Sequence, residues 1–142
     1  MTVEPDDLMK AARAARKRAY CPYSRFSVGA AAQTRDGRVF AGCNVENASY
    51  GLTICAERVA LFNAVSADAR DIVRVAVSCQ KKAGQSPETL MPCGACRQVL
   101  AEFMRSDGEV LVDGVGVFTV AALLPQPFQL DRAAGRSKRG NA

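Results

Sequence analysis

The stretch Ile72-Val73-Arg74-Val75-Ala76-Val77-Ser78-Cys79, near the middle of the chain, decides the fold. An almost continuous β-branched run of this length is typical of a buried central strand, because both faces of such a strand pack against other elements. Apolar residues recur at helical spacing before it, over residues 53–65, and after it, over residues 93–104. We therefore expect the strand to lie in a sheet that helices cover.

The rest of the chain extends this pattern in both directions. Pro5 and two aspartates make a favourable first turn for a helix, Asp36-Gly37 predicts the turn of a hairpin, and Thr53 is the expected N-cap of the second helix. The predicted elements are helix 5–19, hairpin 26–41, helix 53–65, strand 72–79, helix 93–104, strands 110–112 and 115–118, and helix 119–124. The order α-β-β-α-β-α-β-β-α predicts a mixed sheet with helices on both faces.

Length and composition indicate one soluble domain. The chain has 142 residues, of which 49% are apolar and 23% charged. We expect residues 1–130 to form this domain and residues 131–142 to be a basic, disordered tail. The first residues are acidic and resemble no signal peptide, and no apolar run approaches the ~20 residues that span a bilayer. A cytoplasmic location with no membrane partner is therefore expected.

The formal net charge of +5 raises the question of a nucleic-acid partner. Nine of the nineteen basic residues lie in the first helix and in the last eleven residues. We interpret them as a solvated helix face and a tail, and expect no nucleic-acid partner.

Cysteine and histidine usage narrows the chemistry further. The six cysteines include one Cys-x-x-Cys pair, which in a reducing compartment indicates metal or redox chemistry rather than a disulfide. The chain contains no histidine, which excludes every mechanism that depends on an imidazole. Acid–base work would have to come from other side chains or from a metal-activated water.

Two clusters, Cys55-Ala56-Glu57 and Pro92-Cys93-Gly94-Ala95-Cys96, supply three thiols and a carboxylate. Both fall at predicted helix N-termini, where the helix dipole favours thiolates. Three thiolates can hold a zinc ion and leave its fourth position open for water, and Glu57 would then move the proton. A structural zinc site, which would need a fourth ligand, and a redox pair are the alternatives.

A zinc ion bound by three thiolates carries unfavourable excess negative charge. Three thiolates leave the ion with a net charge of about −1, which weakens it as a Lewis acid unless donors to the sulfurs compensate. Arg58, about one turn from Cys55, is predicted to donate to the thiolates. Gln98 is a second candidate for this supporting role.

Cys-x-Glu combined with Pro-Cys-x-x-Cys is the known signature of zinc deaminases that act on nucleobases. Over residues 5–130 the chain resembles the small homotetrameric cytidine deaminases. The motifs that carry this resemblance are Tyr20-Cys21-Pro22-Tyr23-Ser24, Phe26-Ser27-Val28-Gly29-Ala30, Gly42-Cys43-Asn44-Val45-Glu46-Asn47-Ala48-Ser49-Tyr50, Ile54-Cys55-Ala56-Glu57-Arg58, Pro92-Cys93-Gly94-Ala95-Cys96-Arg97-Gln98, Leu123-Leu124-Pro125 and Phe128.

The resemblance implies a three-layer α/β/α fold with a five-stranded mixed sheet. It implies hydrolytic deamination of cytidine and 2′-deoxycytidine to the uridines and ammonia, a reaction of pyrimidine salvage. It also implies one Zn²⁺ per subunit, held by Cys55, Cys93 and Cys96, with Glu57 as the acid–base residue.

The resemblance further implies a substrate site shared within a homotetramer. Asn44 and Glu46 would bind the ribose hydroxyls, and Phe26 would pack on the pyrimidine. Ala56 and Tyr50 would also contact the substrate, and a neighbouring subunit would lend Phe128. From the residues alone, Asn44 and Glu46 could instead cap a loop, and Phe26 could belong to the core.

Three other functions remain open at this point. A related branch of aminohydrolases acts on cytosine-containing antibiotics and has the same zinc motifs. A deaminase of single-stranded nucleic acid would need a basic track and exposed aromatic residues, yet this chain has nine aromatic residues and no tryptophan. A zinc-stabilised interaction module would need four protein ligands.

Overall fold

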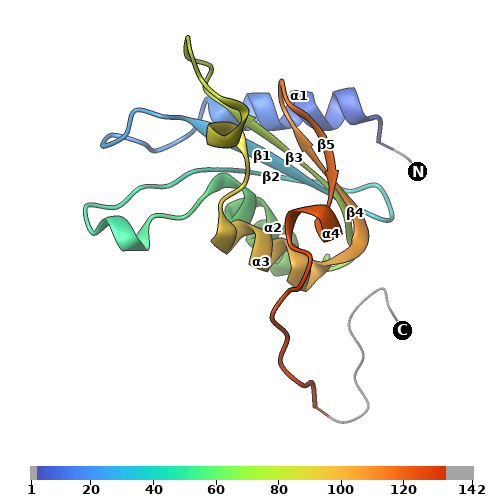
Figure 1. Cartoon of the computed structure of the whole chain (residues 1–142). Helices are drawn as coiled ribbons and strands as arrows, with labels where there is room; N and C mark the ends of the chain where they lie inside the picture. The colour runs from blue at the N-terminus through green and yellow to red at the C-terminus, as the bar shows by residue number, and fades with distance from the viewer. Residues whose placement is uncertain (1–2, 134–142) are drawn as a thin grey trace.

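The computed structural model describes residues 3–133 and has a three-layer α/β/α architecture around a five-stranded mixed sheet (Figure 1). This is the fold class predicted from the sequence. In chain order the elements are α1 (Pro5–Arg16), β1 (Val28–Thr34), β2 (Val39–Cys43), the 3₁₀ helix η1 (Tyr50–Leu52), α2 (Ala56–Ser66), β3 (Ile72–Cys79), the 3₁₀ helix η2 (Pro87–Leu90), α3 (Gly94–Phe103), β4 (Met104–Val112), β5 (Gly116–Thr119) and α4 (Val120–Leu123).

The strand order is β2-β1-β3-β4-β5, so β3 lies at the centre of the sheet as its β-branched run predicted. β3 pairs in parallel with β4, and the other neighbouring strands are antiparallel. The hairpin of β1 and β2 turns at Asp36-Gly37, where Gly37 has a φ of 90°. The glycine has no Cβ and adopts this conformation without strain.

Alternation along the central strands separates two hydrophobic layers. Ala31, Ala76 and Leu111 face α1, whose Leu8, Met9 and Ala12 cover that side of the sheet. The intervening residues of the same strands face α2, α3 and α4 on the opposite side (Figure 1). The α1 layer is closely packed at Gly29, because a Cβ there would lie 2.0 Å from the carbonyl oxygen of Ala12.

Helix α1 ends at Arg16, although the sequence pattern predicted a helix as far as residue 19. The alanine and basic residues beyond Arg16 favour helix, but the Tyr20 N–H donates to the carbonyl oxygen of Asn44. The Glu46 N–H in turn donates to the carbonyl oxygen of Tyr20. This pairing between distant segments turns the chain away from the helix axis.

Helix α2 begins at Ala56 with Cys55 as its N-cap, so the prediction of Thr53 as the N-cap was wrong. The Thr53 hydroxyl instead accepts a hydrogen bond from the Asn47 N–H at 3.1 Å, and Ile54 pairs with Val45. The chain is therefore still extended at Ile54, so that the helix cannot begin before Cys55, its N-cap.

Strand β4 begins at Met104, six residues before the predicted strand. Its polar first half hid it from the sequence pattern, and its pairing with β3 is irregular between Ile72 and Arg74. Within residues 3–133, no helix is long and apolar enough to cross a bilayer. The predicted disorder of the tail concerns mainly residues 134–142, which lie outside the described residues.

Candidate active site

The three predicted thiols meet where two helices begin. Cys55 is the N-cap of α2, Cys93 is the N-cap of α3, and Cys96 lies in the first turn of α3. The Sγ atoms of Cys55 and Cys93 are 3.8 Å apart, and those of Cys93 and Cys96 are 3.5 Å apart. All three sulfurs lie within 4.8 Å of one another at the positive ends of two helix dipoles.

These spacings fit a zinc ion. Sulfurs bound to a tetrahedral zinc at 2.3 Å are about 3.8 Å apart, which matches the observed distances. A disulfide would need sulfurs about 2 Å apart, and all six cysteines are free thiols. The cluster can therefore hold a metal ion through Cys55, Cys93 and Cys96, and no other such group occurs among the described residues.

The thiols influence one another's ionisation. Hydrogen bonds from the Cys96 thiol and from Arg58 lower the pKa of Cys55 to about 5, although burial opposes this shift. The contact with Cys55, together with burial, raises the pKa of Cys96. In the absence of a cation, one thiolate is thus stabilised at the expense of its neighbour. A divalent cation favours the thiolate of every ligand.

Glu57 lies in the first turn of α2, with 4% of its surface exposed, and lines the cavity beside the thiols. Burial raises the pKa of its carboxyl to about 7, and the negative charge of Cys55 contributes in the same direction. A carboxyl that titrates near neutrality can both accept and donate a proton during a reaction.

Arg58 approaches the thiols from the same helical turn. Its Nη2 donates a hydrogen bond to Cys55 Sγ at 3.5 Å, and its Nε is buried without a hydrogen-bond partner among the described residues. The interaction with Cys55 raises the pKa of Arg58, so the guanidinium remains charged beside the sulfurs. This geometry suits a donor that offsets thiolate charge.

A cavity of about 250 Å³ opens beside the thiols. Seven of the predicted substrate-site and metal-site residues line it, namely Phe26, Asn44, Glu46, Tyr50, Cys55, Ala56 and Cys93, together with Glu57. Its volume is slightly below the range of about 300–1,000 Å³ that is typical of small-molecule sites. The cavity thus brings together side chains that the sequence separates by up to 67 positions.

Asn44 and Glu46 hold the segment that forms one wall of this cavity. The Asn44 side chain accepts from the Val28 N–H at 2.9 Å and donates to the Phe26 carbonyl oxygen at 2.9 Å. The Glu46 carboxylate accepts from the backbone N–H groups of residues 23 and 24 and from the Ser24 hydroxyl. These bonds lower the pKa of Glu46, the Ser24 hydroxyl contributing most.

Both side chains nevertheless keep hydrogen-bonding capacity toward the cavity. An amide has two N–H donors, of which Asn44 uses one, and a carboxylate has about four acceptor sites, of which Glu46 uses three. The loop-holding role that the sequence left open is therefore compatible with a second contact to a ligand.

Phe26 is half-buried, packs against the main hydrophobic core and also lines the cavity. Its backbone is fixed at both ends, because its N–H donates to the Ser24 hydroxyl at 3.0 Å and its carbonyl oxygen accepts from Asn44. The ring is thus both a core residue and a cavity wall.

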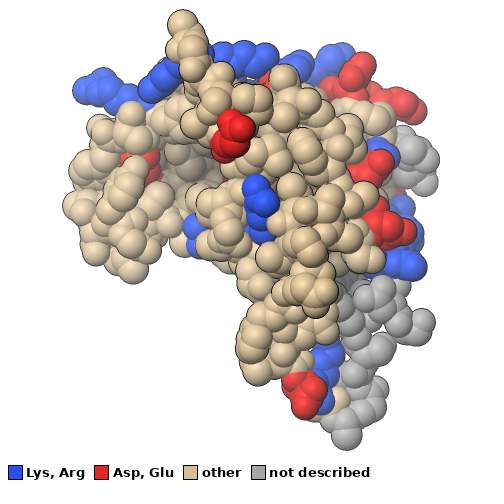
Figure 2. Space-filling view, in the orientation of Figure 1, with Lys and Arg blue, Asp and Glu red and all other residues tan. Residues whose placement is uncertain are grey.

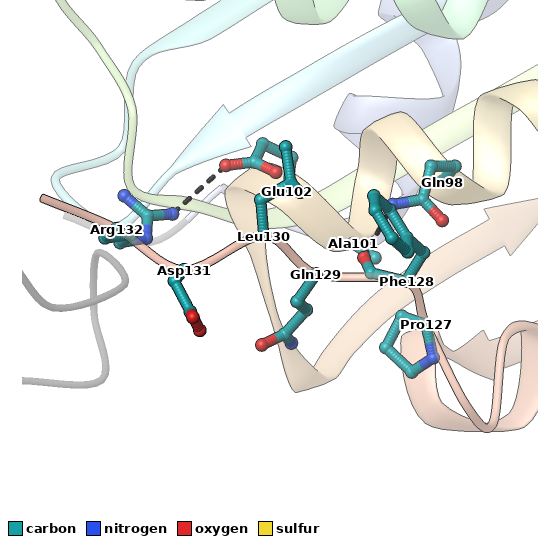
Figure 3. A pocket seen from close by; sticks show the side chains of 9 residues that line it. All are labelled: Gln98, Ala101, Glu102, Pro127, Phe128, Gln129, Leu130, Asp131 and Arg132. Carbon is teal, nitrogen blue, oxygen red and sulfur yellow. Dashed lines mark hydrogen bonds and ion pairs between the residues drawn. The ribbon is translucent and has the colours of Figure 1, made fainter.

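Phe128 and Gln98 lie away from the thiols. Figure 3 shows Gln98 on α3 and Phe128 beside this helix, where Gln98 Nε2 donates to the Phe128 carbonyl oxygen at 2.9 Å. They line a separate cavity of about 350 Å³ between α3 and residues 127–132, which contains none of the thiols. Phe128 is 67% exposed and does not reach the cavity of its own chain.

The placement of Gln98 does not support the predicted contact with the sulfurs. Two residues correspond to about 200° around a helix, so Gln98 and Cys96 point to opposite sides of α3. Arg97 makes the contacts that secure this turn, because its guanidinium donates to the carbonyl oxygens of Pro92 and Leu123 at 2.8 and 3.0 Å.

Sequence reasoning missed part of the cavity wall. Thr89, Leu90 and Met91 line it from the segment between β3 and α3, and Cys79 lines it from the end of β3. The adjacent polar loop matched no motif. The loop could have been identified from its position directly before Pro92-Cys93, because residues that precede a metal ligand in the chain must lie close to it.

Comparisons with known proteins agree with this geometry. Residues 3–112 match the family described as the cytidine and deoxycytidylate deaminase zinc-binding region. The cytidine deaminase of Halalkalibacterium halodurans is 50% identical over 125 residues, covering 85% of this chain and 91% of the relative. The crystal structure of cytidine deaminase from Burkholderia pseudomallei superimposes with a TM-score of 0.79 at 47% identity, covering 89% of this chain and all of that one.

A more distant relative bears on the antibiotic alternative. The blasticidin-S deaminase of Bacillus cereus is 30% identical over 111 residues, covering 74% of this chain and 79% of the relative. The chain is thus more similar to the cytidine deaminase of Halalkalibacterium halodurans than to this antibiotic deaminase, and over a larger share of its length.

Proposed function

The chain belongs to the family of the cytidine and deoxycytidylate deaminase zinc-binding region, and on this basis we propose that it hydrolyses cytidine and 2′-deoxycytidine to the corresponding uridines and ammonia. The observation that carries the proposal is the cavity itself. Two of the three thiols that fit zinc line it, together with a buried carboxyl and hydrogen-bonding groups suited to a sugar. One zinc per chain, held by Cys55, Cys93 and Cys96, would activate water as a nucleophile near neutral pH.

Glu57 is the proton carrier of the proposed reaction. Its carboxylate accepts a proton from the attacking water and delivers it to N3 of the pyrimidine as the C4–O bond forms. It then transfers the second water proton to the C4 amine, which leaves as ammonia when the C4–N bond breaks. Burial suits both roles, because it holds the pKa of Glu57 near neutrality.

The remaining side chains bind and orient the nucleoside. Asn44 and Glu46 offer one N–H donor and one acceptor site to the ribose hydroxyls, while Phe26 packs on the base. Ala56 and Tyr50 complete the wall near the base. Arg58 donates to Cys55 and so offsets the charge that three thiolates would place on the metal.

We propose a free nucleoside rather than a polynucleotide as the substrate. The carboxylate of Glu46 lies at the cavity wall and would repel a nearby phosphate. Lys and Arg side chains gather instead along the edge of the molecule over α1 (Figure 2).

The direct test follows the loss of cytidine absorbance together with the release of ammonia. Cytidine and deoxycytidine should be consumed, whereas a cytosine-containing oligonucleotide and blasticidin S should be turned over far more slowly. Efficient turnover of the oligonucleotide or the antibiotic, with little on cytidine, would overturn the proposed substrate class.

We further propose a homotetramer in which each site receives Phe128 from a neighbour. The exposed Phe128 ring does not line the cavity of its own chain, and Tyr50, which does line it, is also exposed. Co-expression of Glu57→Gln and Phe128→Ala chains provides a test. Mixed tetramers contain sites with an intact Glu57 and a neighbour's intact Phe128, so their activity should exceed the sum of the two parents. A simple sum would contradict sharing.

Two further parts of the proposal concern organisation and location. Residues 1–130 are proposed as the catalytic domain, with the basic residues that follow contributing nothing to catalysis. Truncation after residue 130 should leave cytidine turnover intact. A cytoplasmic location is proposed because the site depends on reduced thiols, and cell fractionation tests it.

A further inference from the structure

The segment from Gln80 to Leu90, which follows β3 and ends with η2, places a cation beside the substrate cavity. The Nζ atom of Lys82 lies 5.5 Å from the centroid of the Phe26 ring. Phe26 lines the cavity and Lys82 does not, so the ammonium group contacts the ring from outside the cavity lining. No ion pair among the described residues includes Lys82.

Hydrogen bonds fix the segment that carries Lys82 to the segment that carries Phe26. The Gln80 N–H donates to the Ser27 carbonyl oxygen at 2.8 Å, and the Ser27 N–H donates to Gln80 Oε1 at 3.2 Å. Gln85 closes the loop, because its Oε1 accepts from the Lys82 N–H at 2.7 Å and its Nε2 donates to the Gln80 carbonyl oxygen. The Lys82 backbone is therefore held at a defined place relative to the Phe26 ring.

The backbone of Phe26 is also fixed, by Ser24 at its N–H and by Asn44 at its carbonyl oxygen. Its remaining freedom lies in the two side-chain torsions that orient the ring. A cation over one face of an aromatic ring is attracted by the ring quadrupole, which favours the orientation that keeps the face toward the cation. The opposite face then has no cation over it and is available to pack on a base.

We propose that Lys82 is a positioning residue, which holds the Phe26 ring in the orientation that packs on the substrate base. The inference rests on the proposed nucleoside deaminase function and adds to it a role for the loop that matched no motif. Because the ring contacts the base alike in the bound and reacting states, loss of Lys82 should raise KM and leave kcat nearly unchanged. An exposed cation–π contact predicts a KM increase of about 2–5-fold, equivalent to about 0.5–1 kcal/mol.

The chain offers a matched control in the neighbouring residue. Lys81 points to the turn after β4, since a Cβ added at Gly114 would lie 3.5 Å from its Nζ. Lys81→Met therefore removes the same charge from the same loop without affecting the ring. Lys82→Arg keeps a cation and should retain most of the wild-type KM.

The experiment measures kcat and KM for cytidine in wild type, Lys82→Met, Lys82→Arg and Lys81→Met, and repeats Lys82→Met in a Phe26→Leu background. We expect the KM increase only in Lys82→Met and only when Phe26 is present. An unchanged KM in Lys82→Met, an equal increase in Lys81→Met, or an equal increase in the Phe26→Leu background would overturn the positioning role. A wild-type protein that does not consume cytidine would instead refute the underlying function, so the two failures are distinguishable.

Discussion

The ion pair between Arg13 and Asp113 stabilises the fold at neutral pH, and the free energy of unfolding that it contributes should fall in acid by an amount that can be calculated. Asp113 follows β4 and has 6% of its side chain exposed. It accepts hydrogen bonds from Arg13 Nη2 and Nε at 2.7 and 3.0 Å and from the Ser78 hydroxyl at 2.8 Å. These bonds connect α1 to the ends of β3 and β4.

Hydrogen bonds from Arg13, assisted by one from Ser78, lower the pKa of Asp113 from 3.8 to about 2. Because the folded pKa lies below the unfolded one, the carboxylate stabilises the fold above about pH 4, and this contribution is lost as pH falls toward 2. The full difference corresponds to about 2.4 kcal/mol at neutral pH. Arg13 is half-exposed, so screening by solvent reduces the expected value to about 1–2 kcal/mol.

Asp113→Asn should therefore lower the free energy of unfolding by about 1–2 kcal/mol at pH 7. The assay is urea unfolding at fixed protomer concentration, repeated between pH 7 and pH 2.5. Both proteins lose zinc alike in acid, so the difference between them isolates Asp113, and it should shrink below pH 4. Asp107→Asn, at an exposed pair, should change stability by less than about 0.5 kcal/mol. A difference between wild type and Asp113→Asn that stays constant down to pH 2.5 would refute the electrostatic reasoning.

Three other substitutions test the packing and the thiol cluster. Arg58→Met removes the donor to Cys55 Sγ and should weaken zinc retention about 10-fold, measured by competition with a chelator; unchanged retention would contradict its role. Gly42→Ala places a Cβ 2.4 Å from the Ala60 backbone nitrogen and should cost about 3 kcal/mol in urea unfolding, whereas an unchanged midpoint would show that α2 moves freely. Leu61→Ala removes a fully buried side chain and should cost about 2–5 kcal/mol by the same assay; a loss below 1 kcal/mol would mean that the core closes around the space.

The sequence predicted the architecture where local pattern and tertiary packing agree. The β-branched run at Ile72–Cys79 became the central strand over the same residues, and Asp36-Gly37 formed the hairpin turn. The two cysteine motifs lie at helix N-termini as predicted, because chain spacing and helix geometry together determine which side chains share a face.

The sequence was less informative where contacts between distant segments determine the ends of a helix or the wall of the cavity. Backbone pairing of Tyr20 with Asn44 and Glu46 shortened α1, and a hydrogen bond to Thr53 delayed the start of α2. Neither partner can be identified from local propensity. The cavity wall at Thr89, Leu90 and Met91 likewise depends on how a polar loop folds back, which no periodic pattern encodes.

The central claim is that a buried carboxyl moves protons beside a thiolate-bound zinc. The most direct measurement compares wild type with Glu57→Gln, following cytidine absorbance and ammonia release while zinc per chain is quantified in both. Glutamine preserves the shape of the side chain but cannot exchange a proton, so zinc content should stay equal while turnover falls by about 10²–10⁴-fold. Equal turnover by the two proteins at equal zinc content would contradict the account.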